Sequence, residues 1–102
     1  MVTPKVQSNF GACVDVFAPS QDILGAGTTN PSSTKTDSGT SFGTALVSGI
    51  LAKLLSENPR QTPSQLKQYL LRRASRDILK PPMGHSSWPP NTVNLLVHEG
   101  CY

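Results

Sequence analysis

The sequence predicts an α/β fold made of short strands and two helices, on the strength of three observations. β-branched and aromatic residues gather at 13–17, as is typical of strands, and a second short candidate strand follows at 22–27. Residues 41–57 are apolar nearly all round a helical wheel, and residues 62–75 carry the start signals and spacing of an amphipathic helix. With 102 residues, nine prolines and eight glycines, the chain can build only one small, loop-rich core.

Composition and charge exclude several classes of protein. No run reaches the roughly 20 apolar residues of a membrane span, and no heptad or collagen repeat persists. The formal net charge is +3, and seven of the nine basic residues lie between positions 53 and 80. Such a segment is more often a solvated helix face than a phosphate-binding surface, so nucleic-acid binding is kept only as a second hypothesis.

The two cysteines and the first residues leave the cellular compartment open. Cys13 and Cys101 match no metal-binding spacing, and a bridge between them, two free thiols, or a lost partner for each all fit the sequence. Residues 1–11 lack the apolar core of a secretory signal. We therefore expect either a cytosolic protein or one whose signal lies upstream.

The first part of the chain predicts strands and turns. The strand at 13–17 ends at Ala18-Pro19-Ser20, and a second short strand follows at 22–27. Residues 28–37 are predicted to form a polar loop, because Asn30-Pro31 is typical of turns.

The helix predicted at 41–57 is apolar nearly all round until Lys53, so it must be buried on most sides. A chain of this size cannot cover such a helix, which indicates that residues 1–102 are part of a larger domain. Pro59 ends the helix, because proline cannot continue it and disfavours helical geometry at Asn58.

The helix predicted at 62–75 begins with Thr62 as N-cap, Pro63 at the first position and Gln65 closing a capping box. We expect one face to pack and the opposite face to be solvated. The packing face holds Leu66, Leu70, Leu71 and Ala74, and the solvated face holds Tyr69, Arg72, Arg73 and Arg76. An irregular loop at 81–91 and a short apolar stretch at 92–96 complete the chain.

A turn of small residues delivers Ser41 to the first turn of the apolar helix. Free N–H groups and the positive end of the helix dipole favour negative charge at this position, and Gly39 and Gly43 leave room for a substrate backbone. These features suit a nucleophile. The alternative is that Ser38, Thr40 or Ser41 merely caps the helix, which is a common role for these residue types.

Residues 39–49, Gly-Thr-Ser-Phe-Gly-Thr-Ala-Leu-Val-Ser-Gly, resemble the nucleophile motif of the subtilisin-like serine proteases, Gly-Thr-Ser-Met-Ala-Thr-Pro-His-Val-Ala-Gly. Further segments are similar to the family in order, at 8–11, 14–19 and 23–24, and residues 92–96 follow as in its proteinase K branch. The resemblance covers nearly the whole chain but only the C-terminal third or so of the family's catalytic domain. It implies a three-layer α/β fold in which helices cover both faces of a parallel sheet, with the serine helix at the centre.

The resemblance makes Ser41 the acyl-forming nucleophile and its N–H a donor of the oxyanion hole, assisted by the hydroxyl of Thr40. The Asp, His and Asn that complete such a site lie upstream in this family. His85 and His98 lack the family's His-Gly-Thr setting, so we expect both to be surface residues. The chain alone is therefore predicted to be inactive. The complete enzyme is expected to be extracellular and to hydrolyse proteins or peptides, with the upstream part of its own domain as partner, without membrane contact.

Asp15 matches an aspartate that binds calcium in this family together with main-chain carbonyls from an upstream loop. A carboxylate with carbonyl oxygens suits a hard cation. One carboxylate cannot hold calcium alone, so we expect a turn aspartate in this chain and a structural calcium ligand in the complete protein. No cofactor is expected for catalysis.

The sequence departs from the family at Ala45 and Leu46, where the motif has Pro and His, and at Ser20, where Gly usually follows the proline. None of these changes removes the nucleophile. They leave open a degenerate pseudoenzyme, or a non-catalytic basic module that binds an acidic partner through Arg72, Arg73 and Arg76.

Overall fold

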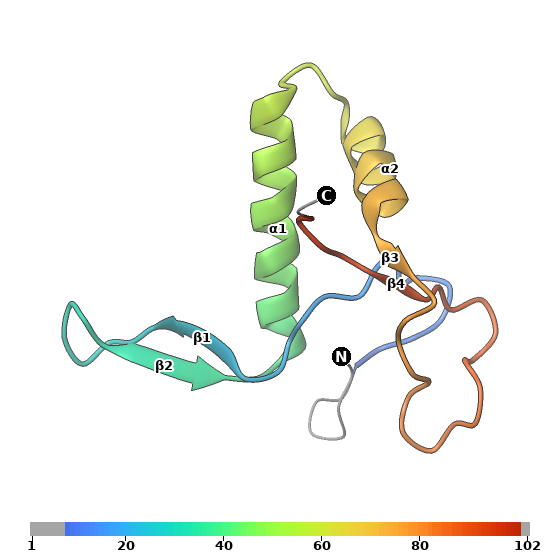
Figure 1. Ribbon diagram of the computed structural model, residues 1–102, viewed down its shortest axis with the longest axis horizontal. Helices are drawn as coiled ribbons and strands as arrows, with labels where there is room; N and C mark the ends of the chain where they lie inside the picture. Colours follow the sequence, from blue (N-terminus) through green and yellow to red (C-terminus); the bar gives the residue numbers. More distant parts are fainter. Residues whose placement is uncertain (1–7, 101–102) are drawn as a thin grey trace.

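The computed structural model describes residues 8–100, which form two helices and four short strands (Figure 1). The elements are β1 (Ile23–Ala26), β2 (Thr34–Asp37), α1 (Thr40–Glu57), α2 (Pro63–Arg73), β3 (Ser75–Arg76) and β4 (Leu95–Leu96). The mixed α/β architecture predicted from the sequence is confirmed. Within these residues no helix is long and apolar enough to cross a membrane.

β1 and β2 form an antiparallel hairpin that extends away from the two helices (Figure 1). Its register pairs Ile23 with Asp37 and Ala26 with Thr34. The prediction of a loop throughout 28–37 is therefore wrong for its last four residues. β2 reads Thr-Lys-Thr-Asp and is exposed along its whole length, so it carries no apolar alternation by which a strand is recognised.

The strand predicted at 13–17 is reduced to a single parallel bridge between Phe17 and Leu96. Phe17 donates its N–H to Leu95 O and accepts from Val97 N, both at 2.8 Å. Among the described residues, this bridge is the one parallel pairing that forms of the expected parallel sheet. The buried Phe17 ring also contacts Trp88 from the 81–91 loop, with a centroid separation of 5.5 Å.

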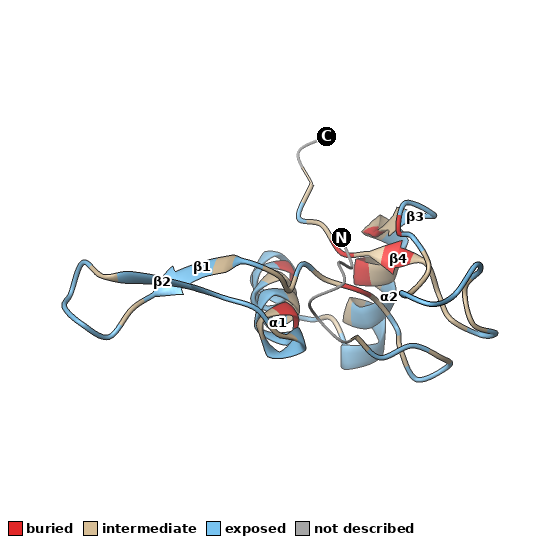
Figure 2. Ribbon diagram, turned by 90° about the horizontal axis from the view of Figure 1, so that it is seen from below, coloured by how far each residue is buried: buried red, intermediate tan, exposed pale blue. Residues whose placement is uncertain are grey.

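α1 starts one residue before the predicted position and ends at Glu57, before Asn58-Pro59 as expected. Of its residues only Gly43 and Leu54 are buried, while Leu46 and Leu55 remain 40% exposed. Figure 2 shows most of the α1 surface as exposed. The expectation that this chain leaves much of the apolar helix uncovered is confirmed.

α2 begins with the predicted capping box. The Thr62 hydroxyl accepts from Gln65 N at 3.2 Å, and Gln65 Oε1 accepts from Thr62 N at 2.9 Å. The helix ends at Arg73 rather than near Ser75, because Ser75 and Arg76 leave it to pair with β4.

The predicted division of α2 into two faces is correct for Leu70 and Arg72 but wrong for Tyr69 and Arg73. Tyr69 packs against the core instead of facing solvent. Arg73 follows Tyr69 by one helical turn, donates to its hydroxyl at 2.7 Å and lies over its ring at 5.2 Å. The tyrosine thus shields one of the three arginines of the expected solvated face.

The core lies where α1, α2 and the C-terminal segment meet. It is built on the buried side chains of Leu54, Leu70 and Val97. Partly buried residues from three segments surround it, namely Val16, Ala18, Val47, Ile50, Leu51, Leu66 and Tyr69. The core therefore fixes the C-terminal half of α1, while the N-terminal end of α1 is held by other contacts.

Candidate active site

The turn before α1 is fixed by two hydrogen bonds to the segment that follows Pro19, one between backbone groups and one to a side chain. Gly39 donates its N–H to Ser20 O at 2.8 Å, and Asp22 donates its N–H to Ser38 Oγ at 2.8 Å. Asp22 adopts a positive φ of 52° to make its bond. The bond joins residues 16 positions apart, so no local sequence pattern predicts it. The one sequence feature that fits is the aspartate itself, a residue type that tolerates left-handed backbone.

Ser41 occupies the second position of α1 and is exposed. The N-cap is Gly39, and no side chain caps the helix. The alternative that Ser38, Thr40 or Ser41 is an N-cap is therefore wrong. Among the described residues, the N–H groups of Thr40 and Ser41 have no acceptor, whereas Phe42 N bonds Gly39 O at 3.0 Å. Ser41 therefore lies in the turn of α1 that holds the free N–H donors and the positive end of the helix dipole.

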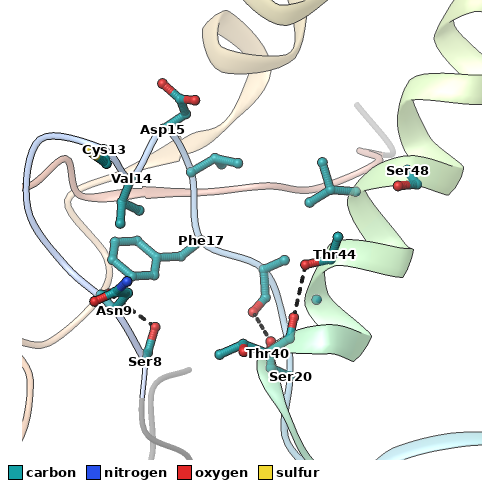
Figure 3. A pocket seen from close by; sticks show the side chains of 14 residues that line it. Ser8, Asn9, Cys13, Val14, Asp15, Phe17, Ser20, Thr40, Thr44 and Ser48 are labelled. Carbon is teal, nitrogen blue, oxygen red and sulfur yellow. Dashed lines mark hydrogen bonds between the residues drawn. The ribbon is translucent and has the colours of Figure 1, made fainter.

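Thr40 lies beside Ser41 at the mouth of a groove, and its carbonyl accepts from Thr44 Oγ1 at 3.2 Å. The groove has a volume of about 700 Å³ and separates the 13–18 segment from the first turns of α1 (Figure 3). Its helix wall consists of Thr40, Gly43, Thr44, Val47 and Ser48. Ser41 is turned about 100° from Thr40 round the helix and does not line the groove.

One edge of the segment opposite this wall has no strand partner among residues 8–100. Phe17 directs both of its backbone groups to the C-terminal segment, its N–H to Leu95 O and its carbonyl to Val97 N. Because backbone groups alternate in direction along an extended chain, Val16 and Ala18 direct theirs to the other side. There only the Ala18 carbonyl is bonded, by Ser20 Oγ at 3.0 Å. The groove is therefore bounded by an extended segment that is paired on one edge only.

The two histidines lie away from Ser41. The exposed His85 ring makes an edge contact with Phe10 at 5.5 Å. His98 lies in a small cavity of about 180 Å³ with Lys53 and Glu57, at the far half of α1. At about 1.5 Å per residue, Lys53 is some 18 Å from Ser41 along the helix. In the part of the chain that the structure describes, no histidine is therefore hydrogen-bonded to Ser41.

Asp15 forms an ion pair with Lys67, with Nζ 2.9 Å from the carboxylate and both side chains about half exposed. The described residues contain no cluster of three potential metal-binding side chains. Since Ca²⁺ takes six to eight oxygens, Asp15 can supply one ligand and the remainder must come from elsewhere. Its role as a calcium ligand stays a prediction.

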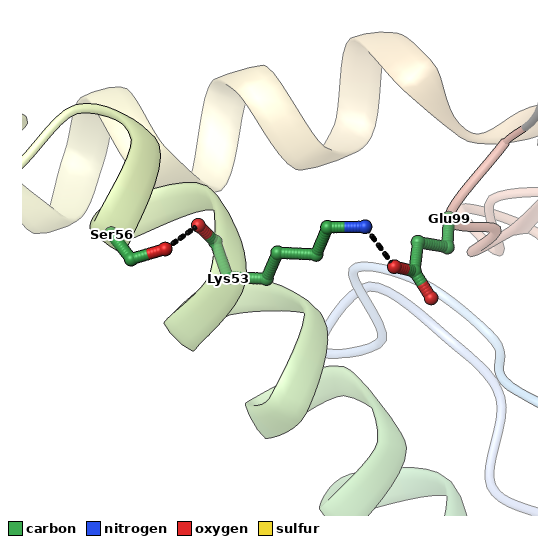
Figure 4. Close-up of polar contacts among 3 residues, drawn as sticks. All are labelled: Lys53, Ser56 and Glu99. Carbon is green, nitrogen blue, oxygen red and sulfur yellow. Dashed lines mark hydrogen bonds and ion pairs between the residues drawn. The ribbon is translucent and has the colours of Figure 1, made fainter.

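Charged pairs at the two ends of α1 have shifted pKa values. The Ser38 N–H and then Lys35 lower the pKa of Asp37, whose carboxylate accepts from Ser38 N at 2.8 Å. At the other end Lys53 bonds Glu99, which raises the pKa of Lys53 and lowers that of Glu99 (Figure 4). The second pair ties the C-terminal segment to the helix, and no local sequence pattern predicts it.

Comparison with known proteins agrees with this geometry. Residues 4–95 match the model of the Peptidase S8 Subtilase family. Proprotein convertase subtilisin/kexin type 9 of Mus musculus is 37% identical over 89 residues, which are 87% of this chain and 12% of that protein. The chain thus spans about an eighth of the length of this curated relative. By the extent of both matches, this chain belongs to the subtilase family.

Proposed function

We propose that the chain carries the nucleophile of a secreted subtilisin-like serine endopeptidase of the proteinase K branch. The observation that carries this proposal is the placement of Ser41, which is exposed at the second position of an 18-residue helix without a side-chain cap. Family membership supports a serine peptidase, and the position of Ser41 supports its role as the reacting residue.

In this reaction the Ser41 hydroxyl attacks the carbonyl carbon of a peptide bond and forms an acyl-enzyme. The oxygen of the tetrahedral intermediate becomes negative. The free N–H of Ser41 and the positive end of α1 stabilise that charge, and the Thr40 hydroxyl adds a donor at the same helix end. A histidine from the upstream part of the domain takes the serine proton and passes it to the leaving amine.

The surfaces that this chain leaves open support the upstream part of the same domain as its partner. The groove beside the extended 13–18 segment has one unpaired edge, and α1 exposes apolar side chains such as Leu46 and Leu55. Both features fit a neighbouring strand and helix. Calcium, held partly by Asp15, and an extracellular location belong to the same proposal.

The experiment is activity-based labelling of the complete protein with a fluorophosphonate, followed by mass spectrometry of the labelled peptide. We expect the label on Ser41 and its loss in Ser41→Ala, with the Tm nearly unchanged because the hydroxyl caps nothing. Ser56→Ala removes an exposed hydroxyl of the same helix that lies outside the groove, and it should keep the label. Labelling that persists in Ser41→Ala would contradict the proposal.

The alternative of a basic module is weakened by the packing of α2. Arg73 is engaged with Tyr69, which leaves Arg72 and Arg76 as the exposed members of the proposed surface. A heparin titration at two salt concentrations tests this alternative. Binding that is lost in Arg72→Gln/Arg76→Gln but is indifferent to Ser41→Ala would favour it.

A further inference from the structure

Ser20 touches the start of the nucleophile helix in two ways. Its carbonyl accepts the Gly39 N–H at 2.8 Å, two residues before Ser41. Its hydroxyl donates to Ala18 O at 3.0 Å and faces Gly43 in the first turns of α1 (Figure 3). One residue therefore contacts both the N-cap and the following turn of the helix.

The hydroxyl of Ser20 occupies the space that a side chain at Gly43 would need. A Cβ built on Gly43 overlaps with Ser20 Oγ, whereas its next neighbours, Ala18 Cβ at 3.4 Å and Ala18 O at 3.6 Å, lie at ordinary contact distance. The only overlap that a side chain at position 43 meets is thus with the Ser20 hydroxyl. The backbone fixes the Cβ of an alanine, so the Ser20 side chain must shift and give up its bond to Ala18 O, or α1 must move.

In the family motif described above, the larger and the smaller residue of this contact are exchanged. It carries alanine at the position of Gly43, and glycine usually occupies the position of Ser20. The larger residue lies on the helix in the motif and on the loop in this chain. The exchange keeps the total volume at the contact nearly constant, which is the condition under which packed sites tolerate substitution.

We propose that Ser20 and Gly43 form a matched pair in which Ser20 is a positioning residue for Ser41. The Ser20 hydroxyl keeps α1 at its distance from the 18–20 segment, and the Ser20 carbonyl holds Gly39, so the pair sets where the first turn of α1 begins. The naming of Ser41 as the reacting group rests on the proposed function. The steric coupling between the two residues does not.

A double-mutant cycle in the complete protein tests the pair, with Gly43→Ala introduced into the wild type, into Ser20→Ala and into Ser56→Ala. Ser56 is a matched control, because its hydroxyl also donates to a backbone carbonyl, Lys53 O at 2.7 Å, but lies more than three turns from Gly43. Ser20→Ala removes the conflicting oxygen and keeps the backbone restricted.

We expect the effect of Gly43→Ala on Tm to be more favourable in Ser20→Ala than in the wild type by about 2–4 °C, and equal in Ser56→Ala and the wild type. Gly43→Ala alone should slow fluorophosphonate labelling by about tenfold, because the helix start is displaced, and Ser20→Ala should restore it. If Gly43→Ala fails to fold, recovery of soluble protein in the double variant supports the pair, and loss in both overturns it.

Equal effects of Gly43→Ala on Tm in all three backgrounds would overturn the inference. A wild type that is never labelled would instead contradict the proposed function, while the Tm cycle would still decide the coupling. The two failures are therefore distinguishable.

Discussion

At the scale of single residues, Asp15 is the proposed ligand of a calcium ion in the complete protein. We predict that millimolar Ca²⁺ raises the Tm of the complete protein and that Asp15→Asn removes most of this rise, because a ligand bound only by the folded state stabilises it. Asp77→Asn is the control, since that exposed residue belongs to no proposed site. A calcium response that survives Asp15→Asn would contradict the assignment.

The pKa of Asp37, three residues before α1, tests which neighbours stabilise its negative charge. Its carboxylate is bonded first by Ser38 N–H and second by Lys35, at 3.2 Å, and both lower its pKa below the ordinary 3.8. A lowered folded pKa contributes stability above the unfolded value, and this contribution is lost as the pH falls through the folded value. We predict that Lys35→Met raises the Asp37 pKa only partly, as measured by carbon NMR titration. Complete return to the ordinary value would show that Ser38 contributes nothing.

Sequence reasoning at this scale succeeded where the chemistry is local. The Thr62 capping box depends on residues three positions apart, and Ser41 was placed correctly at a helix start. The helical spacing predicts a solvated Arg73, and this prediction is wrong. Arg73 bonds the hydroxyl of Tyr69, four residues earlier, and lies over its ring, so spacing alone does not decide its exposure.

At the scale of elements, α2 depends on its N-terminal capping box. We predict that Thr62→Ala lowers the free energy of unfolding by about 1 kcal/mol, because the Gln65 N–H loses its acceptor. Ser64→Ala, in the same turn but outside the box, should change it by less than about 0.5 kcal/mol. Urea unfolding of both variants measures the difference, and equal effects would show that the cap contributes nothing to this helix.

The helices and β1, which lies within the strand predicted at 22–27, were predictable, whereas β2 and the loss of the strand at 13–17 were not, for a physical reason. Helix bounds are marked by residues within the segment, such as Pro63 at the start of α2 and Pro59 after α1. A strand exists only where another segment pairs with it. β2 therefore forms from four polar residues opposite β1, while the β-branched 13–17 stretch pairs at Phe17 alone.

At the scale of the whole molecule, the chain is under-packed for its length. Among residues 8–100 no side chain is less than 2% exposed, and the radius of gyration is 15.2 Å against about 13 Å for a compact chain of this length. Leaving a few hundred Å² of apolar surface uncovered forfeits several kcal/mol at about 25 cal/mol per Å², comparable to the stability of a small domain.

We therefore predict that the isolated chain binds a hydrophobic dye, unfolds without a sharp thermal transition and shows no peptidase activity. Catalysis should be absent because the serine lacks a general base, a loss of about 10⁴- to 10⁶-fold. Scanning calorimetry, sedimentation and a casein assay on the purified chain test this. A cooperative transition at monomeric mass, or labelling of Ser41 at the rate of an intact serine protease, would contradict it.

The contact between the two ends of the chain has a consequence for synthesis. Gly11 donates its N–H to the Thr92 hydroxyl at 2.9 Å, across 81 residues. At about 5–20 residues per second, a ribosome needs about 4–16 s to make that interval, whereas helices form in about a microsecond. During translation α1 and α2 thus exist for seconds before the strand that joins Phe17 arrives. In this interval only residues that were translated earlier can cover the apolar surface of α1.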